Sequence, residues 1–154
     1  MAALLSLKEQ SRIWQVQRQL GLTAARLAHV KKTVEFLGKI RGGKLGAFYS
    51  ALLPQNRRYE DRSAYLARIK WVQEKHSALS PDEQTDLEAG LRLHDIGYAV
   101  GADADHPEKG YQLLHKHNGI WPQLRLAPVR DRQQIEFVVR YHGYFNDIGY
   151  LYRA

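Results

Sequence analysis

Residues 91–98 place an imidazole and a carboxylate side by side, His94 and Asp95, in a mostly apolar segment. Burying such a pair is costly unless hydrogen bonds, a partner charge or a metal ion satisfies both groups. Consecutive helical residues project about 100° apart, so both side chains can lean toward one point beside a helix. An isolated pair of this kind is more often a structural core pair, so the other histidines of the chain decide between the two interpretations.

Three other histidines fall where helices are expected. His29 lies in a segment of about 23–40 whose apolar residues recur every three or four positions, so its side chain is predicted to face inward or into a cleft. His106 stands directly before Pro107 at the expected start of a helix, and His142 continues an apolar stripe. If these helices converge, imidazoles and a carboxylate would surround one cleft, a ligand set that suits Fe, Mn, Zn or Co.

Four motifs stand in order along the chain: Arg26-Leu27-Ala28-His29-Val30, Leu93-His94-Asp95-Ile96-Gly97, His106-Pro107-Glu108-Lys109-Gly110-Tyr111 and Tyr141-His142-Gly143. Together they resemble the signature of the HD superfamily of metal-dependent phosphohydrolases. The resemblance spans about residues 22–154 and implies an all-α, single-domain helical bundle of the HD-domain type. Residues 1–21 would form an N-terminal packing helix, and residues 44–77 would be an insertion, either a lid with phosphate-binding arginines or a packing embellishment.

The resemblance also implies a ligand assignment. His29, His94 and Asp95 would bind a first metal ion together with a distal Asp. His106 and His142 would bind a second ion, with Asp95 bridging the two. The implied reaction is hydrolysis of a nucleotide or another small phosphate ester by a metal-bound hydroxide, with Asp95 as the catalytic residue. The one or two divalent ions would be Mn, Fe, Co, Ni, Zn or Mg, and the basic residues expected to hold the substrate phosphate are Arg26, Lys32, Arg57 and Arg58.

One departure from the family pattern concerns the distal Asp, which commonly follows a run of hydrophobic residue, Arg and Ala on the last helix. The sequence ends at Arg153-Ala154, where that Asp would come next. Either Asp147, five residues after His142, replaces it, or the ligand is missing, or the active form is longer. Two alternatives to hydrolysis follow from this pattern: a di-iron oxygenase of the HD type, and a degenerate module that binds a nucleotide or a partner without catalysis.

The length and composition of the chain favour a single globular domain. The chain has 154 residues, of which 44% are hydrophobic and 25% charged, and no apolar run approaches the roughly 20 residues of a membrane span. No cysteine is present, so disulfides and thiolate metal sites are excluded, and the first residues are too short an apolar run for a secretory signal. These features predict a cytoplasmic protein without a membrane partner. The net charge of +7 favours anionic partners, with a nucleotide preferred to nucleic acid.

The predicted elements are all helical. Residues 3–19, 23–40, 59–77, 81–96, 106–117 and 131–141 are predicted as helices, with a less certain short helix before Pro54 and a last helical turn or two in 145–152. Thr23, Ser80, Asp105 and Asp131 are the expected N-caps, and residues 118–122 are expected to form a turn. His76 and His115 are expected at the surface. The oligomeric state does not follow from the sequence.

Overall fold

The structure is a computed structural model that describes residues 5–44, 62–101, 105–116 and 119–151, with the backbone alone described for 62–66, 68 and 143–151. These residues form seven α-helices and one 3-10 helix, and none of them lies in a strand. The all-α, single-domain prediction is therefore confirmed. In chain order the elements are α1 (Leu7–Gln19), α2 (Ala24–Arg41), α4 (Arg62–Ser77), α5 (Pro81–Leu93), the 3-10 helix η2 (Ile96–Ala99), α6 (His106–Lys116), α7 (Ile120–Leu124) and α8 (Arg132–Leu151).

Local capping fixes several of the helix starts. Thr23 and Ser80 each accept a hydrogen bond from a backbone N–H in the first turn, as the sequence predicts. Asp131 Oδ1 does the same for two N–H groups at the start of α8. The first helix begins at Leu7 and not at residue 3, because Ser6 forms a capping box with Glu9.

Helix ends differ more from the predictions. The helix that contains Ser80 as its cap stops at Leu93, and residues 96–99 form a tighter 3-10 turn in place of its predicted last turn. The last helix runs through Gly143 to Leu151, because one glycine disfavours a helix by only about 1 kcal/mol. Residue 118 of the predicted turn at 118–122 lies outside the described residues, and residues 120–122 instead begin the short helix α7. Pro122 lies in its first turn, where a missing N–H leaves no bond unmade.

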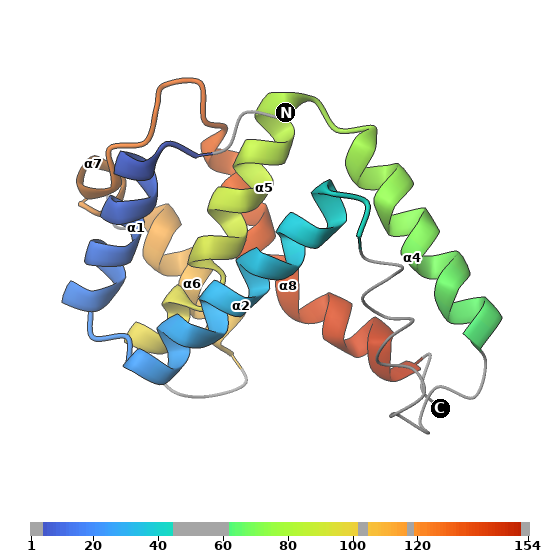
Figure 1. Cartoon of the computed structure of the whole chain (residues 1–154). Coiled ribbons are helices and arrows are strands. Elements are labelled where there is room, and N and C mark those ends of the chain that lie inside the picture. Colours follow the sequence, from blue (N-terminus) through green and yellow to red (C-terminus); the bar gives the residue numbers. More distant parts are fainter. Residues whose placement is uncertain (1–4, 45–61, 102–104, 117–118, 152–154) are drawn as a thin grey trace.

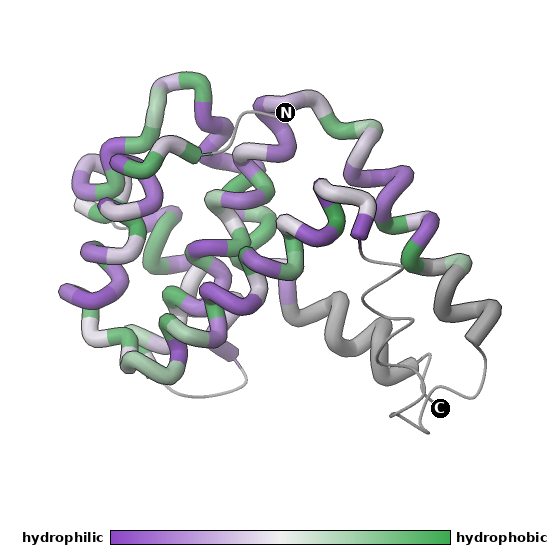
Figure 2. Tube along the Cα trace, in the orientation of Figure 1, coloured by the Kyte–Doolittle hydropathy of each residue, from purple (hydrophilic) through white to green (hydrophobic). Residues whose placement is uncertain are grey.

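One core joins helices from both ends of the described chain. Ile13 of α1, Leu93 of α5, Leu114 of α6, Leu124 of α7 and Ile135 of α8 are buried in the same cluster. Helix α5 packs against α2 and α8, and α8 packs against α6; α1 and α7 contact each other on one side of this centre, with α4 on the other (Figure 1). Hydrophobic and hydrophilic residues follow one another along helices such as α1 and α5 (Figure 2), which lets each helix turn an apolar side to the core. None of the described helices combines the length and apolar character that crossing a bilayer requires.

Helix α2 buries only part of its apolar surface. Leu27, Val30 and Leu37 are buried, whereas Ala25 and His29 are exposed. The apolar residues of α2 cover more than one side of the helix, so periodicity alone leaves open which of them face the core. As a result His29 lies at the edge of the α2–α5 contact, where its side chain can reach across the packed surface.

His76 was expected at the surface, and this prediction is wrong. Its side chain is only 7% exposed, because α4 packs back against α2. Burial lowers the pKa of His76 below its usual value, and the nearby positive charge of Arg41 lowers it further. Its Nε2 has no hydrogen-bond partner. A contact between helices that are far apart in sequence therefore decides the environment of this histidine.

Candidate metal centre

Five structural elements bring polar side chains to one place beside the core. His29 lies on α2, and His94 is the residue that caps the C-terminal end of α5. Asp95 follows directly and begins η2, while His106 is the first residue of α6. His142 lies in the middle of α8. The sequence therefore predicted the members of this cluster correctly as residues that meet, although their positions in the chain span more than 100 residues.

Asp95 occupies the centre of the cluster. Asp95 is only 2% exposed to solvent. The Oδ1 atom lies 3.3 Å from His94 Nε2, 3.4 Å from His106 Nε2 and 3.9 Å from His142 Nε2. The Oδ2 atom lies 3.7 Å from His29 Nε2 and has no hydrogen-bond partner. A buried carboxylate oxygen without such a partner is uncommon in proteins and calls for an unplaced ion or water.

The cluster divides into two groups of three potential ligands that share Asp95. In one group, His29, His94 and Asp95 offer ligand atoms that all lie within 4.8 Å of one another, and His106, His142 and Asp95 do so in the other. His106 Nε2 and His142 Nε2 are 2.9 Å apart. Three protein ligands around an open position are typical of a catalytic metal site, whereas structural sites are closed by four.

Two of the imidazoles are oriented by backbone carbonyl groups. His94 Nδ1 lies 2.6 Å from the carbonyl oxygen of Leu91, and His142 Nδ1 lies 2.7 Å from that of Val139. Each Nδ1–H donates to its carbonyl, which leaves the lone pair on Nε2, the nitrogen that faces Asp95. A metal-binding histidine in proteins is oriented in this same way by its second nitrogen.

Burial keeps the same two rings neutral. Burial, together with the neighbouring His94 and His106, lowers the pKa of His142 to about 4. Burial also lowers the pKa of His94, although the nearby Asp95 carboxylate opposes that shift. Both imidazoles are therefore unprotonated at neutral pH, which is the form that binds a metal ion.

A stack of three side chains forms one rim of the cluster. The guanidinium carbon of Arg26 lies 3.7 Å from the centre of the Tyr98 ring, and this ring stacks on His106 with centroids 4.2 Å apart. Arg26 Nη1 is 3.9 Å from Asp95 Oδ2, and the Arg26 side chain is 43% exposed. The arginine therefore reaches both solvent and the carboxylate. Tyr98 was not predicted as a site residue, because its contacts come from α2 and α6 and no local pattern reveals them.

The other predicted phosphate-binding residues are Lys32, Arg57 and Arg58. Lys32 is an exposed residue further along α2. Arg57 and Arg58 lie outside the residues that the structure describes, as does the side chain of Asp147, although its backbone belongs to α8. Asp147 as the replacement for a distal Asp, and the two arginines as phosphate ligands, therefore remain predictions.

Gly97 and Gly110 allow η2 and α6 to approach each other. A Cβ at Gly97 would overlap the carbonyl oxygen of His106 and would lie 2.7 Å from the backbone nitrogen of Gly110. Gly97 therefore lets the backbone after Asp95 touch the first turn of α6, which places His106 beside Asp95.

Comparison with known proteins adds no relative: no family model, no curated protein and no solved structure matches this chain. The site must therefore be interpreted from its own geometry.

Proposed function

We propose that this chain is a metal-dependent phosphohydrolase that acts on a nucleotide or another small phosphate ester. One observation carries the proposal: the buried Asp95 carboxylate lies within 3.9 Å of imidazole nitrogens from four histidines that belong to different parts of the chain. A structural role would need no more than one or two of these rings. The order of the same residues along the sequence agrees with the HD-type ligand assignment.

The chemistry of the donor set fits two divalent ions. His29, His94 and Asp95 would hold one ion, and Asp95, His106 and His142 would hold the other. The neutral imidazoles and the Asp95 oxygen without a hydrogen-bond partner are groups that a cation would satisfy. When bound, such ions supply the Lewis acidity that activates water near neutral pH and stabilises charge on phosphoryl oxygens.

Arg26 would bind the substrate phosphate. Its guanidinium stands at the rim, half exposed, where stacking on Tyr98 restricts its orientation. A planar guanidinium donates paired hydrogen bonds to phosphate oxygens, and a preset orientation reduces the entropy lost on binding. Because Tyr98 also stacks on His106, the phosphate-binding group and a potential ligand are held by the same ring.

The test begins with metal content and turnover. The purified protein is stripped of metal, reloaded with Mn, Co, Ni or Fe, and assayed for phosphate release from a panel of nucleotides and small phosphate esters. We expect metal-dependent release that falls by more than about 100-fold in Asp95→Asn and His94→Gln, because ligand loss should exceed the 10–100-fold effect of outer residues. His115→Gln is the matched control, since it removes an exposed imidazole from α6 that lies outside the cluster.

The outcomes separate this proposal from its alternatives. Phosphate release that is unchanged in both cluster variants would defeat it. Metal binding with oxygen consumption by the ferrous protein, and no phosphate release, would instead identify a di-iron oxygenase. Binding of a nucleotide or a protein partner without any metal-dependent turnover would identify a non-catalytic module.

A further inference from the structure

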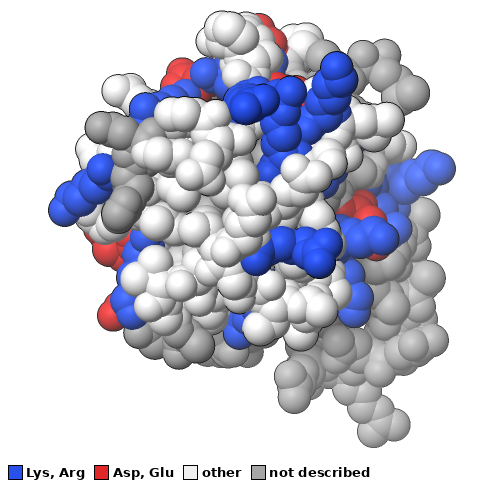
Figure 3. All heavy atoms as spheres, turned by 90° about the vertical axis from the view of Figure 1, so that its left-hand side faces the viewer, with Lys and Arg blue, Asp and Glu red and all other residues white. Residues whose placement is uncertain are grey.

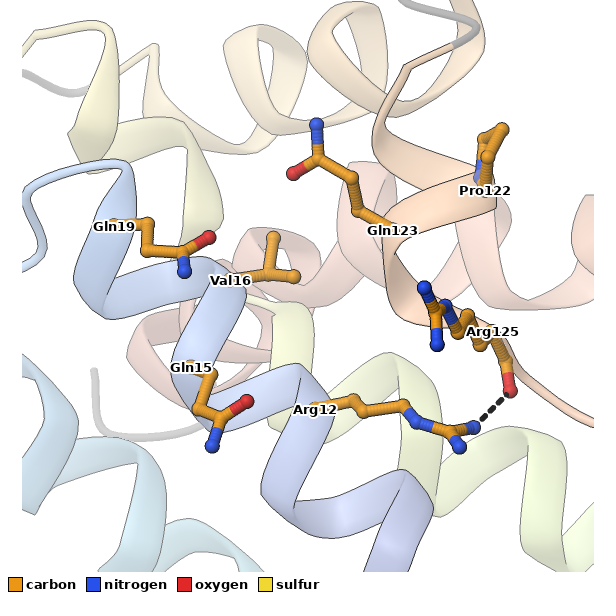
Figure 4. Close-up of a pocket in the computed structure, with 7 residues that line it drawn as sticks. All are labelled: Arg12, Gln15, Val16, Gln19, Pro122, Gln123 and Arg125. Carbon is orange, nitrogen blue, oxygen red and sulfur yellow. Dashed lines mark hydrogen bonds between the residues drawn. The ribbon is translucent and has the colours of Figure 1, made fainter.

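A separate concave site lies between α1 and α7, away from the His/Asp cluster. It is a cavity of about 460 Å³ lined by Arg12, Gln15 and Gln19 from α1 and by Gln123 and Arg125 from α7 and its cap. Figure 4 shows these side chains around the opening between the two helices, with Val16 on its α1 wall. None of the lining residues belongs to the cluster around Asp95.

The backbone of Arg125 is held in an unusual conformation at this site. Arg125 caps the C-terminal end of α7 with φ 47° and ψ 45°, and it is the only non-glycine residue with positive φ in the described part of the chain. Glycine adopts this conformation at less cost, so the chain keeps an arginine side chain at this wall although another residue would suit the backbone better. The guanidinium of Arg12 donates a hydrogen bond of 2.8 Å to the Arg125 carbonyl oxygen, which fixes both arginines at the same wall (Figure 4).

The charge of the cavity is uncompensated. No acidic side chain lines it, and neither Arg12 nor Arg125 has an ion-pair partner among the described residues. Figure 3 shows the face that carries α1 and α7, where Lys and Arg side chains spread across the middle and acidic ones lie toward the edges. An anion that entered this cavity would therefore meet two guanidinium groups without displacing a carboxylate.

We propose that this cavity binds a small phosphorylated molecule of about nucleotide size. The arginines would hold the phosphate, because guanidinium groups match phosphate oxygens in geometry and charge. The three glutamine amides can donate and accept hydrogen bonds, which suits the polar edge of a base or sugar. The volume falls in the range of small-molecule sites, whereas the backbone of a nucleic acid would need an extended groove. This site does not depend on the hydrolase proposal.

The experiment uses the whole chain, stripped of metal so that the Asp95 cluster does not hold phosphate through an ion. Adenosine 5′-monophosphate is titrated into ¹⁵N-labelled protein, with adenosine and a short single-stranded oligonucleotide as comparison ligands. We expect saturable shifts at Gln15, Gln19 and Gln123 with the monophosphate and none with adenosine. The variants are Arg125→Gly and Arg12→Gln, and Arg18→Gln is the matched control, because Arg18 is an exposed arginine of α1 outside the cavity.

The variant Arg125→Gly makes the test decisive. Glycine adopts the positive φ without steric cost, and the variant keeps the backbone carbonyl that accepts the hydrogen bond from Arg12. This variant should keep or raise the melting temperature, yet weaken monophosphate binding by about tenfold or more, as should Arg12→Gln. Arg18→Gln should bind as the unchanged protein does. Equal affinity in Arg125→Gly, shifts confined to the Asp95 cluster, or an oligonucleotide that binds more tightly than the monophosphate would each overturn the proposal.

Discussion

Asp95 is a buried carboxylate that imidazole rings of four histidines surround. Its Oδ1 faces three imidazoles and its Oδ2 faces a fourth, at distances of 3.3 to 3.9 Å that are long for direct hydrogen bonds. Ligand atoms at such separations can close around an ion that lies between them. The metal-free cluster therefore carries a desolvated charge that is only partly compensated.

Replacing this charge gives a prediction about stability as well as metal. In Asp95→Asn we expect bound metal to fall to near zero, because the shared ligand loses its charge. The metal-free variant should be at least as stable as the metal-free parent, since a buried charge has been removed. Metal should raise the melting temperature of the parent but not of the variant. At a metal concentration of 100 times Kd, binding should raise the parent's free energy of unfolding by about 2.7 kcal/mol.

Elemental analysis and thermal unfolding with and without metal measure both effects. His115→Gln should behave as the parent in both. A metal-free Asp95→Asn protein that is strongly destabilised would mean that the carboxylate has a structural role that needs no ion.

His76, which lies outside the Asp95 cluster, should make the stability of the fold depend on pH. Because its pKa is lowered in the folded state, the unfolded state binds more protons below the ordinary value of 6.5. The contribution of neutral His76 to the free energy of unfolding is therefore fully present above pH 6.5. It is lost as pH falls below 6.5, with a slope of at most about 1.4 kcal/mol per pH unit from this one group. The cationic group that faces His76 is Arg41, which opposes its protonation.

The variant His76→Gln isolates this contribution from that of the cluster histidines. Urea unfolding of the metal-free protein at several pH values between 7.5 and 5 should give a shallower loss of stability for the variant than for the parent. Parallel curves would show that His76 does not titrate in the way its burial implies.

At the scale of elements, the contact between η2 and α6 sets the geometry of the cluster. The backbone of Gly97 touches the first turn of α6, and this contact determines how far His106 lies from Asp95. Tyr98, the next residue, stacks on the His106 ring from the same side. The short 3-10 element therefore both places and orients His106.

Gly97→Ala should separate these two elements. The new methyl group would overlap the His106 carbonyl oxygen, so α6 must move, at a cost of about 2 kcal/mol or more. We expect a lower melting temperature and loss of the metal ion that His106 and His142 would hold under the proposed function, measured as a fall in metal stoichiometry. Gly38→Ala is the matched control: its Cβ meets nothing within 4 Å on α2, so stability should rise by about 0.5–1 kcal/mol. Equal metal content in both variants would contradict the positioning role.

At the scale of the whole molecule, α1 is part of the single core and not an appendage. Ile13 is 1% exposed and lies in the cluster that contains Leu93 and Leu114. The N-terminal segment also reaches the central helix through a polar contact, because the Leu5 N–H donates to Glu88 Oε2 at 3.2 Å. Removing the side chain that α1 contributes should therefore destabilise the helices that carry the cluster.

The variant Ile13→Ala tests whether α1 unfolds together with the rest of the core. The truncation should cost about 2–5 kcal/mol, the usual range for a fully buried aliphatic side chain. Helical circular dichroism and tryptophan fluorescence should report one coincident transition in urea for parent and variant alike. Two separated transitions would show that α1 unfolds independently of the rest.

Part of the fold and of the site follows from the sequence alone. The caps at Thr23, Ser80 and Asp131 were predicted correctly, because a capping bond joins residues two or three positions apart and depends on local residue type. The residues that meet around Asp95 were also identified, because the His94-Asp95 pair in an apolar segment is a local pattern and the four ordered motifs resemble a known ligand set.

Tertiary structure decided the rest. The burial of His76, the edge position of His29, the stack of Arg26 on Tyr98 and the cavity around Arg125 all depend on which helices touch. Those contacts come from the packing of surfaces that are distant in the chain, and their free energies are summed over many weak interactions. A local sequence pattern records which side chains a helix offers; only the packed molecule determines which of them meet and at what distance.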